Sequence, residues 1–591
     1  MTFSVSSSNV IVGFLFGSKS PVLKLVLTGD GQPPGHFAAN LKRTLERVAN
    51  PETTASLALI TRDLVLEELL SLTAVFASME CDDLVRGAIS QSALPRPAVD
   101  EHRIELWIPI TQPQFAKRAL NIALGVLNTS ISNEEGEIET NAEALHTQLA
   151  AKPPKPPEHS ITNQPLLLQA AYDLGIPVFQ LNEFHAVLGY GDQLRHFRST
   201  LTDETSALGR EVAQSKFRTA QYLRNLSLPV PAQFLPLNAE QAAAYAQRLG
   251  RPVVIKPDHL DRGVGVHTNL VETEQVREAF KAVKSLSHRV VMEPHYSGFA
   301  HRLTVHRGKV IKVVRRTPGG VLGDGVHNVM ELLERRARDK SVQEKAQRHS
   351  QYLTTLDPIA SRMLSMQGLE PDYLPRQGEF IRLRPTDNLS TGGHNTLLDI
   401  ASDVHSENLA IALRAAEALK LDFAGIDILS DDLSLAWYEN GAVIGEVNVV
   451  PQLGTGTTPE VYREVLELTF PNKGLIDIEV VIDNRENHVH APDASAGNGS
   501  GLSSIAGAWV GRKCIARSVR NSFTAARTLL LHSSAKKAVC YMTPEDVLAF
   551  GLPAVNCMKI TVIAERENNK SLLQKALSPH TEQLTFLSPT K

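Results

Sequence analysis

The sequence has few cysteines, four among 591 residues. Cys81, Cys514, Cys540 and Cys557 show neither the paired spacing of a zinc site nor the density of a disulfide framework. A chain so poor in cysteine does not rely on disulfide bonds, which favours a reducing compartment over secretion. We therefore expect a cytoplasmic protein without thiolate metal sites.

Long apolar runs and a surplus of one charge are also missing. No apolar stretch approaches the roughly 20 residues that span a bilayer, and no basic segment precedes the short apolar run at residues 10–16. The sequence therefore predicts neither a membrane span nor a signal peptide. The formal net charge is −4, which gives no sign of a nucleic-acid partner.

The length of the chain suggests several domains, each with its own core. Residues 1–160 alternate candidate strands at 23–27 and 104–109 with a candidate helix at 113–127, which is an α+β pattern. A proline-rich stretch at residues 151–157 has the composition of a stiff linker and marks the end of this first domain.

The rest of the chain divides once more. Residues 161–480 alternate strands and helices and form the largest predicted domain. Within it, residues 335–375 are charged and helical, and we interpret them as a lid or a solvated arm. Residues 481–591 again alternate helical and strand patterns. The predicted fold class is α/β and α+β, in three domains.

Two neighbouring predicted strands carry acidic and amide side chains. Residues 422–429 form a short apolar strand that includes Asp427, and a second strand is expected from about 435 to 450. Residues two apart on a strand face the same side, so Glu446 and Asn448 point together. If the strands pair as a hairpin, Asp427 joins them, and these hard oxygen donors suit Mg²⁺. The alternative is that the carboxylates are solvated side chains beside a turn.

Two lysines and a glycine loop precede these strands. Lys256 ends the apolar strand 251–257, and the loop after it contains Gly263 and Gly265, whose backbone can approach phosphates. A G-x-G pattern alone is also typical of ordinary turns. Lys216 falls on a predicted helix whose buried side carries Val212 and Leu223, so it is alternatively a surface lysine on an amphipathic face.

In this order, these features resemble those of an ATP-grasp ligase. Four further segments resemble cyanophycin synthetase: Leu-Gly-Tyr-Gly at 188–191, Thr-Asp-Glu-Thr-Ser at 202–206, Gly-Asp-Gly-Val-His at 323–327 and Arg-Pro-Thr-Asp-Asn-Leu-Ser-Thr-Gly-Gly at 384–393. The resemblance runs from about residue 165 to 475. Enzymes of this family build a polyaspartate chain that carries arginine on each side chain. They use one ATP-grasp site for the backbone and one Mur-ligase-like site for the branch.

The resemblance implies roles for matching residues of this sequence. ATP would be bound by Lys216, Lys256, Gly263, Gly265 and Glu293, the last at the adenine hinge, and Mg²⁺ by Asp427, Glu446 and Asn448. Arg316 would meet the transferring phosphoryl group and Arg302 the substrate carboxylate. The substrate-binding set would be Ser390, Thr391, Gly392, Gly393 and Glu211. For Arg316, which follows Arg315, the alternative is a basic strand edge, and for the 390–393 loop it is a plain turn.

A second ATP site is not apparent in the sequence. A Mur-type site needs a glycine loop that ends in Gly-Lys-Ser or Gly-Lys-Thr, and none follows the ATP-grasp region. Arg512 and Lys513 lack such a loop, so we interpret residues 481–591 as a reduced Mur-ligase-like remnant.

This arrangement resembles the truncated second type of cyanophycin synthetase, which joins preformed β-aspartyl-arginine dipeptides. One ATP-grasp site activates one carboxylate per cycle, so it extends a backbone without adding a branch. The implied partners are the dipeptide and the cyanophycin chain. A homo-oligomer, preferably a dimer, is also expected.

Three departures from the family pattern stand beside this resemblance. Ala300 occupies a position that is usually acidic, so an expected contact to a ribose hydroxyl is missing. The loop 258–265 is poorer in glycine than the family loop, and residues 449–453 replace a segment that carries arginine. Two alternatives therefore stay open: an ATP-grasp ligase for another amino acid or dipeptide, and a noncatalytic cyanophycin-binding or regulatory homologue.

Overall fold

In this computed structural model the chain forms two units, residues 1–199 with 454–591, and residues 200–453. From residue 163 to 588 the structure describes the chain except at 183, 262, 349–351, 386, 388–390, 455–459, 484–496, 518 and 564–569. Before residue 163 it describes 3–11, 13–15, 17–18, 22–29, 40, 44, 103–109, 125–126, 128–130 and 139–144. The fold mixes α and β structure, as predicted.

The first unit begins with a three-stranded antiparallel sheet in the order β1-β2-β3. Its strands are β1 (Phe3–Ile11), β2 (Val22–Gly29) and β3 (Arg103–Pro109). The predicted strands at 23–27 and 104–109 are thereby confirmed. The predicted linker at 151–157, and most of the predicted helix at 113–127, lie outside the described residues.

The first unit continues with α6 (Asn163–Leu174), followed by the short antiparallel strands β4 (Val178–Gln180), β5 (Ala186–Leu188) and β6 (Arg195–Arg198). The helix α16 (Glu460–Thr469) packs against α6, and the Tyr462 hydroxyl donates to Asn163 Oδ1 at 3.1 Å. Residues 161–199 and 454–480, which the sequence grouped with the ATP-grasp region, thus lie in this unit.

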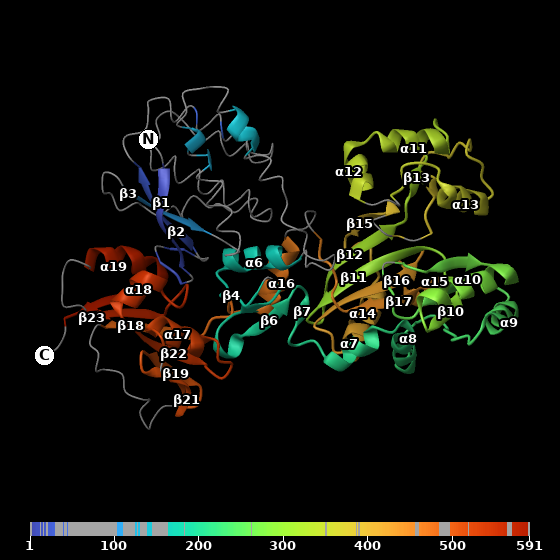
Figure 1. Cartoon of the computed structure of the whole chain (residues 1–591). Coiled ribbons are helices and arrows are strands. Elements are labelled where there is room, and N and C mark those ends of the chain that lie inside the picture. The colour runs from blue at the N-terminus through green and yellow to red at the C-terminus, as the bar shows by residue number, and fades with distance from the viewer. Residues whose placement is uncertain are drawn as a thin grey trace. The chain divides into compact units, whose positions relative to one another are not determined.

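A seven-stranded mixed sheet forms the C-terminal part of the first unit (Figure 1). In sheet order its strands are β21 (Lys513–Arg517), β20 (Gly507–Val510), β19 (Ser500–Ser504), β22 (Lys537–Met542), β18 (Asp477–Asp483), β23 (Lys559–Ile563) and β24 (Leu584–Leu587). Its helices are α17 (Ser522–Leu530), α18 (Pro544–Phe550) and α19 (Lys570–Leu577). Aliphatic side chains from strands and helices share one core, so the alternating pattern predicted for residues 481–591 is confirmed.

The second unit begins with β7 (Leu201–Thr202) and the helices α7 (Ala207–Ala213) and α8 (Lys216–Asn225). The prediction that Val212, Lys216 and Leu223 share one helix was wrong, because the chain breaks at Ser215. The Ser215 side chain accepts a hydrogen bond from the Arg218 N–H and starts α8 as its N-cap. Lys216 is therefore the first residue of α8, close to the positive end of the helix dipole.

The next part of this unit is a three-stranded antiparallel sheet in the order β10-β8-β9. It consists of β8 (Val253–Pro257), β9 (His267–Leu270) and β10 (Val290–Pro294), with α9 (Ala239–Leu249) and α10 (Thr273–Leu286). One face of the sheet packs on both helices in an aliphatic core. The predicted strand that ends near Lys256 is confirmed.

The centre of the second unit is a five-stranded antiparallel sheet in the order β15-β12-β11-β16-β17 (Figure 1). Its strands are β11 (Phe299–His306), β12 (Lys309–Thr317), β15 (His394–Leu398), β16 (Phe423–Ser430) and β17 (Val443–Asn448). The helix α14 (Ser406–Ala418) covers one face of this sheet. The predicted strand from 435 was partly wrong, because α15 (Trp437–Asn440) precedes β17 and ends at Gly441, whose φ is +71°.

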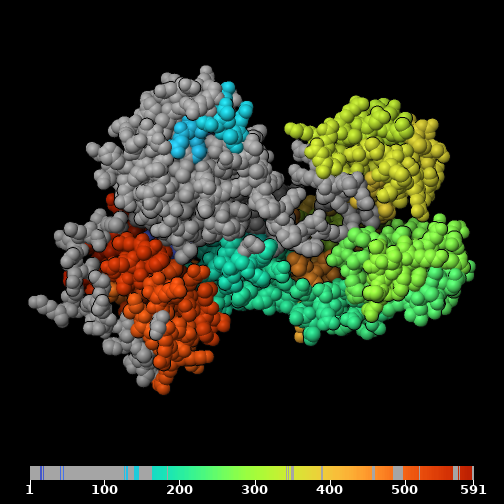
Figure 2. Space-filling model, viewed as in Figure 1, coloured from blue at the N-terminus to red at the C-terminus, as the bar shows by residue number. Residues whose placement is uncertain are grey.

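A helical lobe completes the second unit. It contains β13 (Gly320–Leu322), paired with β14 (Phe380–Arg382), and the helices α11 (Val329–Ala337), α12 (Lys340–Arg348) and α13 (Pro358–Met366). The predicted helical insertion is present, and its role as a lid stays a prediction. Figure 2 shows a hollow between this yellow lobe and the green part around α9 and α10. Among the described helices, none is both long and apolar enough to cross a bilayer.

Candidate functional site

One face of the five-stranded sheet carries the predicted charged residues. Arg302 lies opposite Asp427 across β11 and β16, and Asp427 lies opposite Glu446 across β16 and β17. Residues directly opposite each other point to the same side of a sheet, so all three share a face. Asn448 joins this face because it follows Glu446 by two residues. The predicted hairpin between the two acidic strands is confirmed by this register.

The Asp427 carboxylate lies at the centre of this face and is 6% exposed. Both its oxygens accept from Arg302: Nε donates to Oδ1, and Nη2 donates to Oδ2 at 2.9 Å. Arg316 Nη1 lies 3.4 Å and Asn448 Nδ2 lies 3.3 Å from Oδ2. Burial alone would raise the pKa of Asp427, but the charges of Arg302 and Arg316 outweigh it and lower that pKa. The carboxylate therefore stays ionised.

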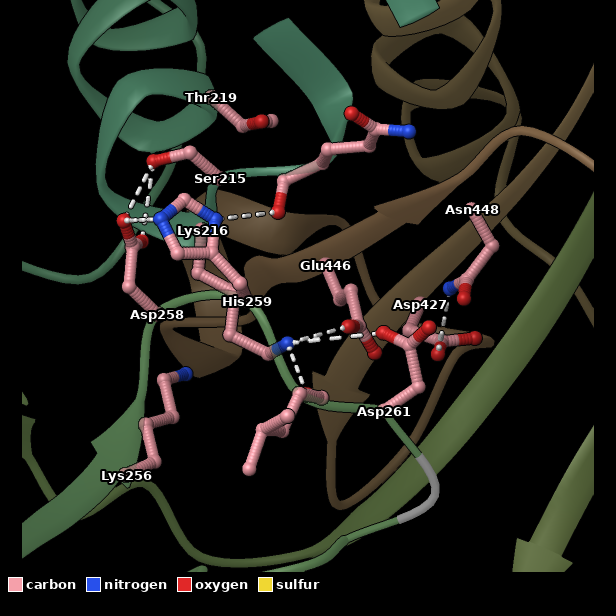
Figure 3. Close-up of polar contacts among 12 residues, drawn as sticks. Ser215, Lys216, Thr219, Lys256, Asp258, His259, Asp261, Asp427, Glu446 and Asn448 are labelled. Carbon is pink, nitrogen blue, oxygen red and sulfur yellow. Dashed lines mark hydrogen bonds and ion pairs between the residues drawn. The ribbon is translucent and has the colours of Figure 1, made fainter. Parts of the chain in front are cut away.

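Glu446 connects this face to the first turn of α8. Its Oε1 lies 3.0 Å from Lys216 Nζ, and the same ammonium donates to the Leu260 carbonyl at 2.7 Å (Figure 3). Asp261 is farther away, at 3.9 Å, and mostly exposed. Lys216 thus lies between the acidic face and the loop after β8, where it brings a positive charge to both.

Lys256 and Glu293 form an ion pair on the β8–β10 sheet. Lys256 Nζ lies 2.6 Å from Glu293 Oε1, and their side chains are only 10% and 5% exposed. Glu293 lies opposite Val254, two residues before Lys256, so both charges share a face. Gln233 Nε2 donates to the second Glu293 oxygen at 2.7 Å. The predicted phosphate and adenine contacts of this pair stay predictions.

The loop after β8 requires glycine at both predicted positions. Gly263 has φ +71° and Gly265 has φ +70°, in the left-handed region that side chains disfavour. A Cβ on Gly265 would also lie 3.0 Å from side-chain atoms of Pro257 and Leu286. The glycines are therefore explained by the turn itself, and their predicted contact with phosphates stays a prediction.

The oxygen donors on the sheet face are of the kind that Mg²⁺ prefers, and the Asp427 oxygens among them are bound to Arg302 in this structure. Among the described residues, no group of three or more His, Cys, Asp or Glu side chains is arranged so that it could hold a metal ion by itself. The candidate set has two carboxylates and one amide: Asp427, Glu446 and Asn448. Asn448 turns its NH₂ group to Asp427, which leaves its amide oxygen as an acceptor. Such a set suits a hard cation that takes its remaining ligands from phosphates and water.

The predicted substrate residues lie elsewhere in the second unit. Gly392, with φ +101°, accepts a 2.6 Å hydrogen bond from Arg336 Nη2 of α11, and Thr391 and Gly393 flank it. Ser390 lies outside the described residues. Glu211 is on α7 and forms an exposed 3.4 Å pair with Arg218. Among the described residues, no hydrogen bond or ion pair joins it to another predicted site residue. The substrate roles of these residues stay predictions.

Sequence reasoning missed Asp258, a fully buried carboxylate. The Ser215 hydroxyl lies 2.8 and 3.0 Å from the two Asp258 oxygens and donates its single proton between them, and the Phe217 N–H donates to Oδ1 at 2.9 Å. Arg289 Nη1 at 3.3 Å and His259 Nε2 at 3.2 Å complete its surroundings. Figure 3 shows Asp258 facing Ser215 and His259.

The position of Asp258 connects the two predicted phosphate lysines. It follows Lys256 by two residues, and its carbonyl accepts from the backbone N–H of Lys216 at 3.2 Å. The carboxylate also satisfies N–H groups at the start of α8, where negative charge is favourable. Its sequence signal was weak: one acidic residue directly after Lys256-Pro257.

No protein-family model matches this chain. This chain is 33% identical over 320 residues to a cyanophycin synthetase of Trichormus variabilis. The aligned region covers 52% of this chain and 35% of that protein. For the cyanophycin synthetase of Crocosphaera subtropica the identity is 28% over 391 residues, with coverage of 63% and 44%. A glutathione biosynthesis bifunctional protein GshAB of Pasteurella multocida is 27% identical over 304 residues, with coverage of 49% and 40%. The chain thus spans about a third to under half the length of these relatives.

Solved structures give weaker likenesses. A bifunctional glutathione synthetase from Pasteurella multocida is 21% identical with a TM-score of 0.39. The matched region covers 61% of this chain and 53% of the synthetase chain. A D-alanine–D-alanine ligase from Bacillus anthracis is 13% identical with a TM-score of 0.29, and covers 46% and 70%.

Proposed function

We propose that this protein is an ATP-dependent carboxylate–amine ligase with an ATP-grasp site. The observation that carries the proposal is the charged sheet face, on which Asp427, Glu446 and Asn448 lie beside Arg302 and Arg316. Phosphoryl transfer depends mainly on positioning and charge neutralisation, and such a face supplies groups for both. The sequence similarity to ligases supports the same class.

We further propose that the reaction extends cyanophycin by β-aspartyl-arginine dipeptides. The similarity to proteins named cyanophycin synthetase supports the polymer. The printed sequence contains no Gly-Lys-Ser or Gly-Lys-Thr loop, which supports building blocks that already carry arginine. In this proposal residues 161–480 form the ATP-grasp domain and residues 481–591 a reduced Mur-ligase-like remnant, in a cytoplasmic homo-oligomer.

The proposed reaction has two steps. The γ-phosphoryl group of ATP passes to the C-terminal carboxylate of the growing cyanophycin polymer, and ADP leaves. The α-amine of the dipeptide then attacks the acyl carbon, phosphate leaves, and the amine loses a proton. Mg²⁺, held by Asp427, Glu446 and Asn448, would neutralise phosphate charge.

Within this reaction each cation has a specific role. Lys216 and Lys256 would hold the phosphates, with Gly263 and Gly265 over them. Arg316 would stabilise charge on the transferring group, and Arg302 would orient the substrate carboxylate. In the structure both donors of the Arg302 fork are bound to Asp427, so in this proposal Arg302 exchanges Asp427 for the substrate carboxylate when Mg²⁺ and substrate bind.

Phosphate release by the purified protein tests this proposal. We expect release with ATP, Mg²⁺, a polymer primer and β-aspartyl-arginine, and none when free aspartate and arginine replace the dipeptide. Glu446→Gln serves as the inactive control. Release with free amino acids would contradict the dipeptide specificity.

The same assay separates the alternatives. Turnover with another amino acid or dipeptide, but not with β-aspartyl-arginine, would favour a different ligase, an alternative that the similarity to a glutathione biosynthesis protein also supports. Polymer binding without any phosphate release would favour a noncatalytic homologue.

A further inference from the structure

A cavity lies beside α17 in the C-terminal part of the first unit. The helix packs on β19 and β22 through buried apolar residues such as Ala526 and Leu529 (Figure 1). Thr524 and Arg527, three residues apart on another face of α17, line a cavity of about 420 Å³. This volume falls within the roughly 300–1,000 Å³ that is typical of sites for small molecules.

Arg527 lines this cavity without an acidic partner. Its Cζ atom lies 5.3 Å from the centre of the Phe179 ring of β4, which is a cation–π contact. Within the described residues its guanidinium donates no hydrogen bond, and no carboxylate pairs with it. Partial burial lowers the pKa of Arg527, because no neighbouring acid offsets the lost hydration of the charge. The N–H donors of this side chain are therefore available to a ligand.

An enclosed arginine elsewhere in this protein shows the usual solution. Arg384 is 1% exposed, and its Nη2 lies 2.6 Å from Asp357 Oδ2. An acid of α18, Asp546, lies close to the start of α17, but it accepts from the Ser522 N–H at 2.7 Å and from the Ser522 hydroxyl at 2.6 Å. The positive charge of Arg527 thus stays uncompensated within the described residues, which favours an anionic ligand.

The other side chains that line the cavity are polar or aromatic. Asn521 accepts from the Thr524 N–H at 2.7 Å through its Oδ1, so its NH₂ group points away from that bond. The rings of Phe523 and Phe550 stack with their centres 5.8 Å apart. Aromatic faces attract cations, and guanidinium groups in particular. The cavity therefore combines a positive group for an anion with an aromatic wall for a cation.

We propose that this cavity binds an arginine branch of the polymer, with the branch carboxylate on Arg527 and its guanidinium over the Phe550 ring. The inference rests on the proposed function, which supplies the polymer. Each β-aspartyl-arginine unit attaches arginine through its α-amine, so every branch keeps a free carboxylate and a free guanidinium. Arg527 binds the carboxylate by two parallel hydrogen bonds. Residues 481–591 thereby anchor the polymer without consuming ATP.

Titration of the full-length protein with two synthetic tetramers tests the proposal. One is a β-aspartyl-arginine tetramer, and the other carries agmatine in place of arginine, which keeps the guanidinium but lacks the branch carboxylate. Both end in a C-terminal amide, so neither can be extended. Wild-type protein should bind the arginine tetramer about tenfold more tightly, as expected for a charged hydrogen bond. Arg527→Gln should bind both tetramers with the lower affinity.

Two variants and a kinetic measurement separate binding from a structural role. Arg527→Lys keeps the charge without the guanidinium fork, so its affinity for the arginine tetramer should lie between those of wild type and Arg527→Gln. Arg517→Gln removes an exposed arginine of β21 and should bind as the wild type does. In turnover, Arg527→Gln should raise the KM for a polymer primer about tenfold. It should leave kcat and the KM values for ATP and free dipeptide unchanged.

Three results would overturn the inference. Two are unchanged affinity of Arg527→Gln for the arginine tetramer and equal affinity of the wild type for both tetramers. The third is a raised KM for the free dipeptide instead of the primer, which would assign the cavity to the monomeric substrate. All three leave the proposed ligase intact. Tetramer binding requires no turnover, so tetramer binding that depends on Arg527, in a protein that releases no phosphate, would refute the ligase and keep this inference.

Discussion

Lys256 and Glu293 form a more deeply buried ion pair than Lys216 and Glu446. The Glu293 side chain is 5% exposed and that of Glu446 is 29% exposed. Removing one partner of a buried pair leaves an uncompensated charge, which costs more than the pair itself contributes. At the residue scale, the predicted site therefore consists of charges that stabilise one another in the absence of a ligand.

This difference predicts separable effects of two conservative substitutions. Glu293→Gln should lower the free energy of unfolding by about 3 kcal/mol, because Lys256 stays buried without a counter-charge. Glu446→Gln should lower the free energy of unfolding by about 1 kcal/mol or less, because the Glu446 carboxylate is partly solvated and Lys216 keeps its hydrogen bond to the Leu260 carbonyl. Urea denaturation measures both values. Equal losses would contradict the assigned burial.

His301 predicts a pH dependence of stability. It lies on β11, is 2% exposed, and burial lowers its pKa from 6.5 to about 4. The unfolded chain therefore binds a proton between these pH values that the folded chain does not bind. The contribution of neutral His301 to the free energy of unfolding is complete above pH 6.5. It is lost as the pH falls from 6.5 to 4, by up to about 3 kcal/mol. The unfolding free energies of wild type and His301→Gln, measured at several pH values, should differ in slope over this range. Parallel curves would refute the prediction.

At the scale of elements, the strands of the site could be predicted because apolar residues mark them clearly. The stretch 422–429 matches β16 within one residue, and the hairpin to β17 places Asp427 opposite Glu446 as expected. The helix α15 could not be predicted, since its four residues make little more than one helical turn, too few to show a repeating hydrophobic pattern. The start of α15 is set by the Ala436 N–H, which donates to the Glu439 carboxylate, and its end is set by Gly441.

Contacts between segments far apart in the sequence could not be predicted either. Asp258 lies in a loop, where no periodic pattern indicates the direction of a side chain. Its partner Ser215 comes from another element that only the fold brings near. The residue types at a strand end can be recognised in a sequence. The residues that hold those strand ends in place cannot.

Asp258 predicts coupling between α8 and β8. Asp258→Ala should destabilise the protein by about 1–3 kcal/mol, because it removes acceptors for the Ser215 hydroxyl and the Phe217 N–H. It should also weaken ATP binding about tenfold, because Lys216 begins the helix that Asp258 holds. Ser215→Ala keeps the carboxylate and the Phe217 bond, so it should have a smaller effect on both quantities. Calorimetry and hydrogen exchange at Phe217 provide the measurements. ATP affinity unchanged in Asp258→Ala would refute the coupling.

At the scale of the whole molecule, the predicted nucleotide and metal residues all belong to the second unit, residues 200–453. The first unit has a mixed sheet with parallel strands β19, β22, β18, β23 and β24, an arrangement that can support a phosphate loop. The sequence after β18 begins Asn-Arg-Glu-Asn and contains no Gly-Lys pair. Within the printed sequence, the charged face of the second unit is therefore the one ATP site that we propose.

A single site predicts a fixed stoichiometry. Each dipeptide joined to the polymer should release one phosphate, whereas separate addition of aspartate and arginine would require two. Glu446→Gln should abolish all ATP hydrolysis, because no second site would remain to sustain it. The measurement compares phosphate released with dipeptide incorporated, using labelled β-aspartyl-arginine, in wild type and variant. Two phosphates per dipeptide, or hydrolysis that survives in Glu446→Gln, would show that another ATP site is active.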